Sequence, residues 1–223
     1  MWVFDGLSCQ NKRSSNMDRL MVGMRRIENR QVLLAVVCDG VGSAVDGEKA
    51  ANMTVQMLAD WFDAIETVSR IGLELMGRVR IISDYIAQIM NGTERRAATT
   101  VSALLLLDEY YYLVHAGDSR VYVFDGGRAR QLTTDQAENG KLTQYVGQSE
   151  PLLPQYEEGA LGGGVILLCT DGVFKRIAPD ELADLLKKVK PKSIRKTMEN
   201  VIDLAVRRGE SDNITLAIVM KER

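Results

Sequence analysis

The chain has 223 residues and a formal net charge of −2, and 46% of its residues are apolar. These values are typical of a globular domain with a real core, and the near-neutral charge argues against nucleic acid or a membrane surface as the main partner. The single histidine, His115, excludes zinc sites with two histidine ligands, and we interpret it as a packed or hydrogen-bonded strand residue. Three scattered cysteines favour free thiols in a reducing cytoplasm, and no apolar run is long enough to span a membrane.

Continuous apolar runs predict strands whose two faces are both buried. Weak strands are expected near residues 2–4 and 19–24, and clear ones at 32–38, 101–107, 110–116, 120–124, 165–169 and 214–220. Apolar residues that recur every three or four positions predict helices over 51–65 and 71–89, and Asn91-Gly92 is expected to end the second. Two more helices are predicted at 179–188 and 193–208.

This order of elements is not the regular βαβα alternation of a doubly wound fold. It predicts an α+β fold in which mainly antiparallel sheets have helices packed outside them. Residues 126–164 show little periodicity and are rich in glycine, so we interpret them as a long surface loop. No repeat or linker divides the sequence, and we expect one domain over residues 1–223.

Aspartates occur at the ends of several predicted strands. Asp39-Gly40 and Asp171-Gly172 each follow a buried strand, Asp212 precedes the last strand, and Asp118 lies in a tight turn. If the last strand is antiparallel to the other two, these carboxylates reach one edge of the sheets. Carboxylates that converge without matching cations repel one another, and Mg²⁺ or Mn²⁺ would relieve this repulsion. Two such ions can activate a water molecule and bind a phosphoryl group.

Seven short sequence segments, some of which contain these aspartates, follow one another along nearly the whole chain. They are RSSNMD at 13–18, DGVGS at 39–43, ATT at 98–100, GDSR at 117–120, LTTD at 132–135, CTDG at 169–172 and SDN at 211–213. Together they resemble the motifs of the metal-dependent protein phosphatases of type 2C, the PPM family. The resemblance implies a four-layer α-β-β-α sandwich, with two mainly antiparallel sheets flanked by helices. It also implies that residues 126–164 contain a reduced form of the flap that shapes the substrate site.

The resemblance assigns a metal-binding role to four positions. Asp39 would bridge two ions, the backbone carbonyl of Gly40 would bind one of them, and Asp171 and Asp212 would bind the other. Metal-bound hydroxide would then attack phosphorus in line. The substrates implied are phosphoserine and phosphothreonine in proteins, the products of a Ser/Thr kinase pathway.

Three further positions would support this centre. Asp18 would hold a metal-bound water, and Asp118 would bind a weaker third ion together with Asp171. Arg13 would bind the substrate phosphate, for which a planar two-pronged donor is well suited.

The sequence also departs from the family pattern. Met17 replaces a polar residue, Ser43 replaces the last glycine of DGxGG, and Val41 and Gln136 each replace a histidine common in the family. Lys175 stands where an acidic ligand of the third metal is common, and it should weaken that ion or substitute for its charge. Two alternatives therefore stay open: a catalytically weak relative that binds phosphoproteins or regulates a partner, and a phosphatase for a small phosphorylated metabolite.

Overall fold

The computed structural model describes residues 1–42, 44–90 and 97–222. Within them, the strands form two five-stranded antiparallel sheets and a small two-stranded one. The first sheet has the order β1 (Trp2–Cys9), β12 (Ile214–Lys221), β11 (Val165–Cys169), β6 (Arg120–Asp125), β7 (Arg128–Gln131). The second has the order β10 (Gln155–Ala160), β5 (Tyr110–Ala116), β4 (Val101–Leu107), β3 (Arg30–Asp39), β2 (Asp18–Ile27). The small sheet pairs β8 (Ala137–Glu138) with β9 (Lys141–Leu142).

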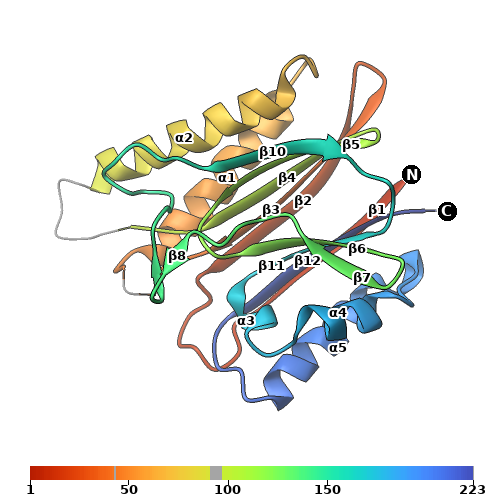
Figure 1. The fold of residues 1–223 in the computed structure, drawn as a ribbon. Coiled ribbons are helices and arrows are strands. Elements are labelled where there is room, and N and C mark those ends of the chain that lie inside the picture. Colours follow the sequence, from red (N-terminus) through yellow and green to blue (C-terminus); the bar gives the residue numbers. More distant parts are fainter. Residues whose placement is uncertain (43, 91–96, 223) are drawn as a thin grey trace.

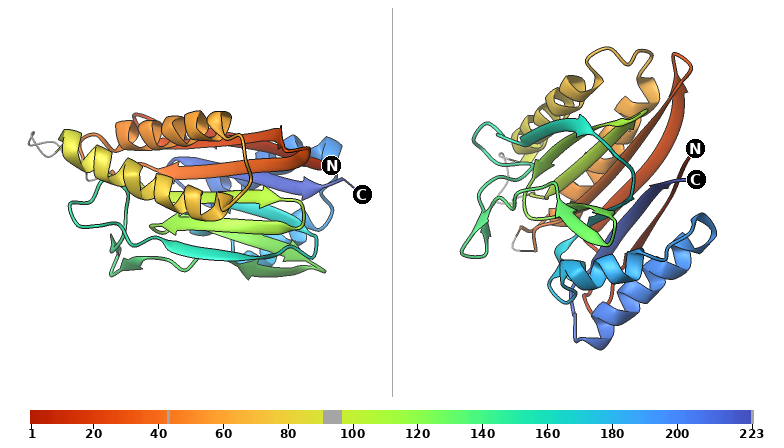
Figure 2. Two further views of the ribbon diagram at one scale, coloured as in Figure 1. Left: turned by 90° about the horizontal axis from the view of Figure 1, so that it is seen from above. Right: turned by 45° about the vertical axis from the view of Figure 1, so that its right-hand side comes forward.

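Helices cover the outer face of each five-stranded sheet, so the molecule has four layers (Figures 1 and 2). The helices α1 (Gly47–Ala64) and α2 (Ile71–Met90) pack on the second sheet. The first sheet is covered by α3 (Asp171–Phe174), α4 (Pro179–Leu186) and α5 (Ile194–Arg207), with a 3₁₀ turn at Pro191–Ser193. The predicted α-β-β-α sandwich is therefore confirmed. No helix in the described residues is long and apolar enough to cross a membrane.

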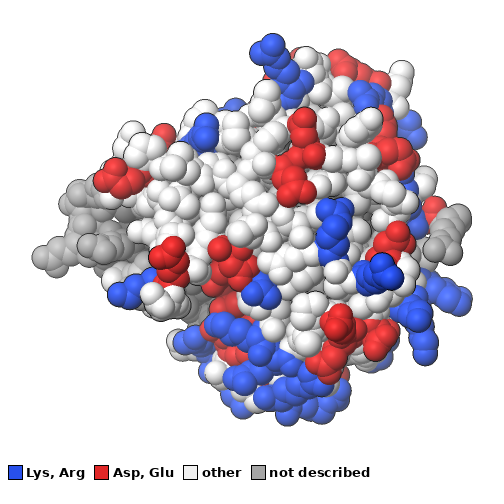
Figure 3. Space-filling model, viewed as in Figure 1, with Lys and Arg blue, Asp and Glu red and all other residues white. Residues whose placement is uncertain are grey.

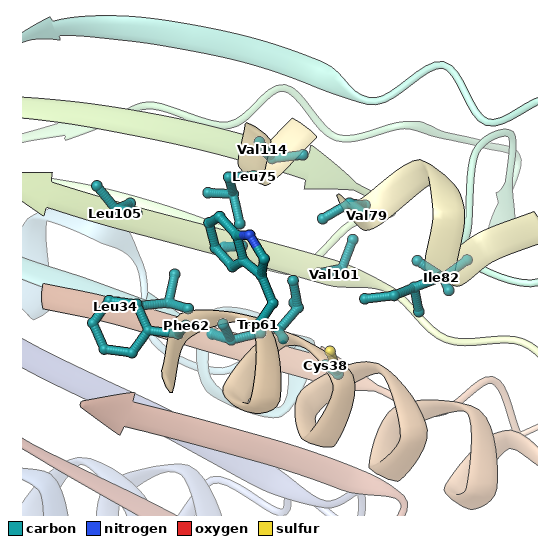
Figure 4. Packing of buried hydrophobic residues seen from close by; sticks show 14 of the residues in the cluster. Leu34, Cys38, Trp61, Phe62, Leu75, Val79, Ile82, Val101, Leu105 and Val114 are labelled. Carbon is teal, nitrogen blue, oxygen red and sulfur yellow. The ribbon is translucent and has the colours of Figure 1, made fainter. Parts of the chain in front are cut away.

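Strand β3 shows why the apolar runs are continuous. Leu34 and Val36 belong to the cluster under α1 and α2, whereas Leu33 and Val37 belong to the cluster between the sheets. Because alternate residues of a strand face opposite sides, both sides of β3 are buried over residues 32–38, and every residue in that stretch is apolar. Figure 4 shows the outer cluster, in which Trp61 and Leu75 of the two helices lie over the sheet. Truncating one such leucine to alanine typically costs about 2–5 kcal/mol.

The interpretation of residues 126–164 as a loop is wrong in part. This stretch contains β7, β8, β9 and β10, and β7 and β10 are edge strands of the two large sheets. An edge strand has one neighbour and one open side, so it carries polar residues and lacks the apolar pattern of a central strand. The weak strands at the N-terminus are also longer than predicted, and Asn91-Gly92 lies outside the described residues.

Candidate metal centre

Four aspartates from four different elements line one cavity of about 220 Å³. Asp39 ends β3, Asp118 lies in the turn between β5 and β6, Asp171 begins α3 directly after β11, and Asp212 precedes β12. Strand β12 is antiparallel to β11, as the sequence argument required, so Asp171 and Asp212 reach the same end of the sandwich. Arg13 and Gly40 line the same cavity, and Asp18 lies behind it.

The glycine that follows each strand-end aspartate allows another backbone to approach closely. A Cβ atom on Gly40 would lie 2.7 Å from the Gly47 carbonyl, at the start of α1. A Cβ atom on Gly172 would lie 2.1 Å from the carbonyl oxygen of Asn213. Both distances are too short for any side chain, so these Asp-Gly pairs are required by packing around the cavity rather than by a turn alone.

The threonines of the ATT segment hold the backbone of Asp39. The Asp39 amide donates to Thr100 Oγ1 at 2.9 Å, and the Thr100 amide donates back to the Asp39 carbonyl at 2.9 Å. Thr99 Oγ1 donates to the same carbonyl at 2.9 Å, and Thr100 Oγ1 lies 2.8 Å from Ser119 Oγ. The ATT segment therefore positions the backbone of Asp39, and Ser119 of the GDSR segment supports Thr100 from the other side.

Asp18 is buried directly behind Asp39, and the two residues are paired across β2 and β3. Thr170 Oγ1 donates a hydrogen bond of 2.8 Å to Asp18 Oδ2. Burial raises the pKa of Asp18 to about 6, although hydrogen bonds from Thr215 and Thr170 partly oppose this. Burial and the charge of Asp18 also raise the pKa of Asp39 well above its usual value. Both carboxyl groups are therefore unfavourable as anions in the absence of a cation.

On the other side of the cavity, Asp212 and Asp171 form ion pairs with basic side chains of the same chain. Arg13 donates from Nε to Asp212 Oδ1 at 2.8 Å and from Nη2 to Oδ2 at 2.7 Å. Lys175 Nζ forms an ion pair with Asp171 Oδ2. Burial opposes ionisation of Asp212, but the hydrogen bond from Arg13, the hydrogen bond from the Asn213 backbone and the charges of Arg13 and Lys175 together outweigh it and lower the pKa of that carboxyl. The expectation of carboxylates without matching cations is thus correct for Asp39 and wrong for Asp171 and Asp212.

Asn213 and Asn11, which the sequence argument did not single out as site residues, fix the loop that carries Arg13. Asn213 Nδ2 donates to the carbonyls of Gln10 and Ser15 at 2.8 and 3.0 Å, and its Oδ1 accepts from the Met17 amide at 2.9 Å. Asn11 Nδ2 donates to the Asp212 carbonyl at 3.0 Å. The positive φ of Asn11, 54°, is typical of asparagine in a tight loop. The amino-acid sequence alone did not indicate that Asn11 contacts Asp212.

The LTTD segment supports the turn that carries Asp118. Asp135 pairs with Arg120, whose Nη2 lies 2.7 Å from Asp135 Oδ2. Gln136 donates from its amide to the Gly117 carbonyl at 2.7 Å, and burial raises the pKa of Asp118. His115 is buried on β5 with its Nδ1 2.9 Å from Ser102 Oγ, the hydrogen-bonded strand residue that the sequence predicts.

The donor set around the cavity fits hard divalent cations. Aspartate carboxylates and Gly40 line the cavity, and oxygen ligands such as carboxylates and backbone carbonyls suit Mg²⁺ and Mn²⁺. The raised pKa of Asp39 is the second sign, because a bound cation would favour its ionised form. No group of three or more His, Cys, Asp or Glu side chains in the described residues is already arranged to hold a metal. Asp171 and Asp212 are each paired with a cation of the chain instead.

A larger hollow, of about 1100 Å³, lies at the opposite end of β11. It is lined by Val165 at the start of that strand, by glycine turns and by lysines such as Lys187 and Lys190. None of the candidate site residues borders it, so its size does not make it the reaction site.

Comparison with known proteins places the chain in a family. The family model of protein phosphatase 2C matches residues 5–205. The chain therefore belongs to the protein phosphatase 2C family, and its enzyme class is protein-serine/threonine phosphatase, as the motif resemblance implied.

Individual relatives are bacterial phosphatases. The chain is 27% identical to protein phosphatase PhpP of Streptococcus pneumoniae, over 93% of this chain and 92% of that protein. The serine/threonine phosphatase of S. agalactiae superposes with a TM-score of 0.88 at 23% identity and full coverage of both chains. The catalytic domain of the phosphatase PstP, solved in complex with two manganese ions, gives a TM-score of 0.81 at 23% identity over 99% of each chain.

Proposed function

We propose that this protein removes phosphate from phosphoserine and phosphothreonine side chains of other proteins with the help of two Mg²⁺ or Mn²⁺ ions. The observation that carries the proposal is the shared cavity, which Arg13, Asp39, Asp171 and Asp212 reach from separate parts of the chain. The family match and the manganese complex of PstP support the same chemistry. The cavity is small, at about 220 Å³, and is suited to a phosphate group rather than to a large ligand.

In this proposal, Asp39 would be shared by the two ions, the Gly40 carbonyl would help to hold one of them, and Asp171 and Asp212 would hold the other. When bound, the ions would act as Lewis acids that lower the pKa of water and neutralise charge on the phosphoryl oxygens. The chain contributes a rigid frame, because Asp39 is held at its backbone by Thr99 and Thr100. A fixed frame of this kind positions the reacting groups before the substrate arrives.

The other candidate residues act around this frame. Asp18, fixed by Thr170, would accept a hydrogen bond from a water molecule at the metals. Asp118 would help Asp171 hold a weaker third ion, and Lys175 would compete with that ion for Asp171. Arg13 would exchange Asp212 for two phosphate oxygens, since its guanidinium presents the same parallel donors to either group.

We further infer that residues 1–223 act as one catalytic domain in the cytoplasm, against the products of a Ser/Thr kinase. The apolar cluster between the two sheets supports one folding unit, because it draws residues from both. The cysteines Cys9, Cys38 and Cys169 are free thiols, which suits a reducing compartment. A reduced flap within residues 126–164 remains part of this proposal.

The direct test is hydrolysis of a phosphothreonine peptide and of p-nitrophenyl phosphate by purified protein, with Mn²⁺ and with EDTA. We expect turnover with Mn²⁺, reversible loss with EDTA, and no turnover by Asp39→Ala. Faster hydrolysis of sugar phosphates than of phosphopeptides would instead favour the metabolite phosphatase. If the protein hydrolyses none of these substrates in the presence of Mn²⁺, the proposal that it is an active phosphatase is contradicted.

A phosphoprotein-binding module with little activity is the second candidate. The ion pairs of Arg13 with Asp212 and of Lys175 with Asp171 favour it, because both place cations of the chain on carboxylates that the metals would need. Calorimetry separates the two functions. Binding of a phosphopeptide without metal and without turnover would support the module, whereas two divalent ions bound tightly would support the enzyme.

A further inference from the structure

A basic hollow lies at the end of β11 that is remote from the candidate metal centre. Its volume is about 1100 Å³, and it lies between the β6–β7 turn, the β10–β11 turn and the segment that joins α4 to α5. Of the described residues that line it, five are lysines and two are acidic. Figure 3 shows Lys and Arg side chains gathered at the lower end of the molecule, over α4 and α5. The hollow therefore has an excess of positive charge.

The lysines that line the basic hollow differ from the basic residues beside it. Residues 187–196 contain six Lys or Arg and no Asp or Glu, in a chain with a net charge of −2. Arg195 and Lys196 lie outside the lining, and they are paired with Asp5 and Glu199. The other four line the hollow, are exposed and form no ion pair with any described residue: Lys187, Lys188, Lys190 and Lys192. Because their charges repel one another, an anionic group that enters the hollow is stabilised.

Glycines leave the basic hollow open at the two turns. Gly126 and Gly127 have φ values of 56° and 79°, so the β6–β7 turn itself requires glycine there. Gly162 is different, because its φ lies outside the left-handed region and a Cβ atom there would meet nothing within 4 Å. Neither the backbone nor the packing of the described residues therefore requires a glycine at position 162. The missing side chain leaves room in the hollow for a ligand.

Part of the lining is apolar. Val165 and Met220 are directly opposite each other in β11 and β12, so their side chains lie on the same face of the sheet. Both pack against the apolar cluster under α4 and α5, yet each remains partly exposed. An apolar surface bordered by lysines is complementary to a chain segment that carries both carboxylates and apolar side chains.

We propose that the basic hollow binds an acidic peptide segment of a partner protein. The unpaired lysines select an anion, and the volume exceeds the about 300–1,000 Å³ of common small-molecule pockets. Nucleic acid fits less well. The one aromatic residue among the described lining residues, Phe124, is 5% exposed, so no ring there is free to stack on a base. A bilayer surface is flat and would touch the lysines without filling the hollow.

The peptide site is separate from the candidate metal centre. Val165 begins β11 and lines the basic hollow, whereas Asp171 follows the same strand and lines the smaller cavity. The six residues between them span about 20 Å in extended chain. A bound peptide therefore leaves the aspartates accessible, and the inference does not depend on the proposed phosphatase function.

Fluorescence anisotropy of a short labelled peptide of Glu-Glu-Leu repeats tests the site. We expect saturable binding at low salt that weakens as NaCl is added, because dissolved ions screen the lysine charges. The double variant Lys188→Glu/Lys190→Glu should weaken binding at least about tenfold. The matched control is Arg26→Glu/Arg207→Glu, which changes the net charge equally at two exposed residues outside the lining. The control should bind the peptide as the wild type does.

Two further comparisons separate specific binding from general attraction between charges. A Gln-Gln-Leu peptide of the same length should bind at least about tenfold more weakly than the Glu-Glu-Leu peptide. Gly162→Glu should also weaken binding with an unchanged Tm, because it adds a carboxylate to the lining without a clash.

Three results would overturn the proposal. One is the absence of saturable binding of the Glu-Glu-Leu peptide at protein concentrations up to about 100 µM. Another is an equal loss of binding in the Lys188→Glu/Lys190→Glu variant and its matched control. The third is tighter binding of single-stranded DNA, or of vesicles of phosphatidylcholine and phosphatidylserine, than of the peptide.

Discussion

The two sides of the cavity lined by Asp39, Asp118, Asp171 and Asp212 differ in how their carboxylates are balanced. On the side of β3, Asp39 and Asp18 lie close together with no ion pair to a cation among the described residues, and both have a raised pKa. On the side of β12, Asp212 is held by both prongs of Arg13, and its pKa is lowered. The β3 side is thus destabilised by its own charge in the absence of a cation, whereas Asp212 on the other side is neutralised from within the chain.

This difference indicates which side metal binding must stabilise. Ionised Asp39 costs free energy in the metal-free protein, and a bound cation would recover that cost. Residues kept in an unfavourable state within a folded protein are commonly the ones that function needs. The ion pair on the β12 side would instead have to open before Asp212 could bind a metal.

The largest expected effect comes from replacing Asp39 and Asp212, one at a time, with asparagine. A group with a raised pKa contributes stability at low pH and loses it as the pH rises through that pKa, so Asp39 in its ionised form destabilises the metal-free protein. Asp39→Asn should therefore raise the Tm of the EDTA-treated protein while it lowers phosphatase activity about 100- to 1000-fold or more. Asp212→Asn should lower that Tm, because it removes the partner of Arg13. Equal shifts of Tm in one direction would contradict the contrast between the two sides.

Asp18 provides a pH test of the same side. Its pKa of about 6 lies above the ordinary aspartate value, so its stabilising contribution is complete below about pH 4 and is lost as the pH rises through about 6. The loss is at most about 3 kcal/mol in the metal-free protein. Asp18→Asn should remove it, which urea unfolding at about pH 4 and pH 7 in EDTA can measure. An unchanged difference between the two pH values would contradict the raised pKa.

Arg13 tests the other side, and the chain supplies a matched control. Arg13→Ala should lower kcat/KM about 10- to 100-fold, since it removes charged hydrogen bonds to the phosphate. Arg195 forms an ion pair with Asp5 at 2.7 Å, and its side chain is 51% exposed against 50% for Arg13. Arg195→Ala should leave kcat/KM unchanged. If both variants lose activity equally, the effect is general and Arg13 has no special role.

Lys175 is expected to have the smallest effect. Its ion pair with Asp171 is partly exposed, and such pairs contribute up to about 1 kcal/mol. Lys175→Ala should therefore tighten Mn²⁺ binding about fivefold at most, which a calorimetric titration can resolve. Lys196→Ala, which removes an exposed partner of Glu199, is the control. Weaker Mn²⁺ binding by Lys175→Ala would mean that the ammonium group supports the metal site.

Much of the fold could be predicted from the sequence, because the central strands of a sandwich are buried on both faces. The ranges expected for β4, β5 and β11 match the structure residue for residue. Edge strands β7 and β10 could not be found in this way. Each pairs with one strand and faces solvent on its other side, so its residues are polar and give no continuous apolar run. The short helix α3 was also missed, because an Asp-Gly pair after a strand reads equally well as a turn.

The aspartates of the candidate site could be predicted from the sequence, but the ion pairs that they form with basic residues could not. Strand ends and motif order identified Asp39, Asp171 and Asp212, which line one cavity in the structure. The ion pair of Arg13 with Asp212 joins residues 199 apart in sequence, and no local pattern encodes such a contact. The hydrogen bond from Thr170 to Asp18 is similar, with a separation of 152 residues. Pairing of β1 with β12 brings Arg13 to Asp212, and packing of the two sheets brings Thr170 to Asp18.

A calorimetric titration of Mn²⁺ into the metal-free protein, alongside Asp39→Asn, tests the central claim most directly. If the carboxylates on the β3 side await a cation, wild-type protein should bind two ions per chain and Asp39→Asn should lose the binding of at least one. Equal binding by both proteins would contradict the account, and so would phosphatase turnover that survives complete removal of metal.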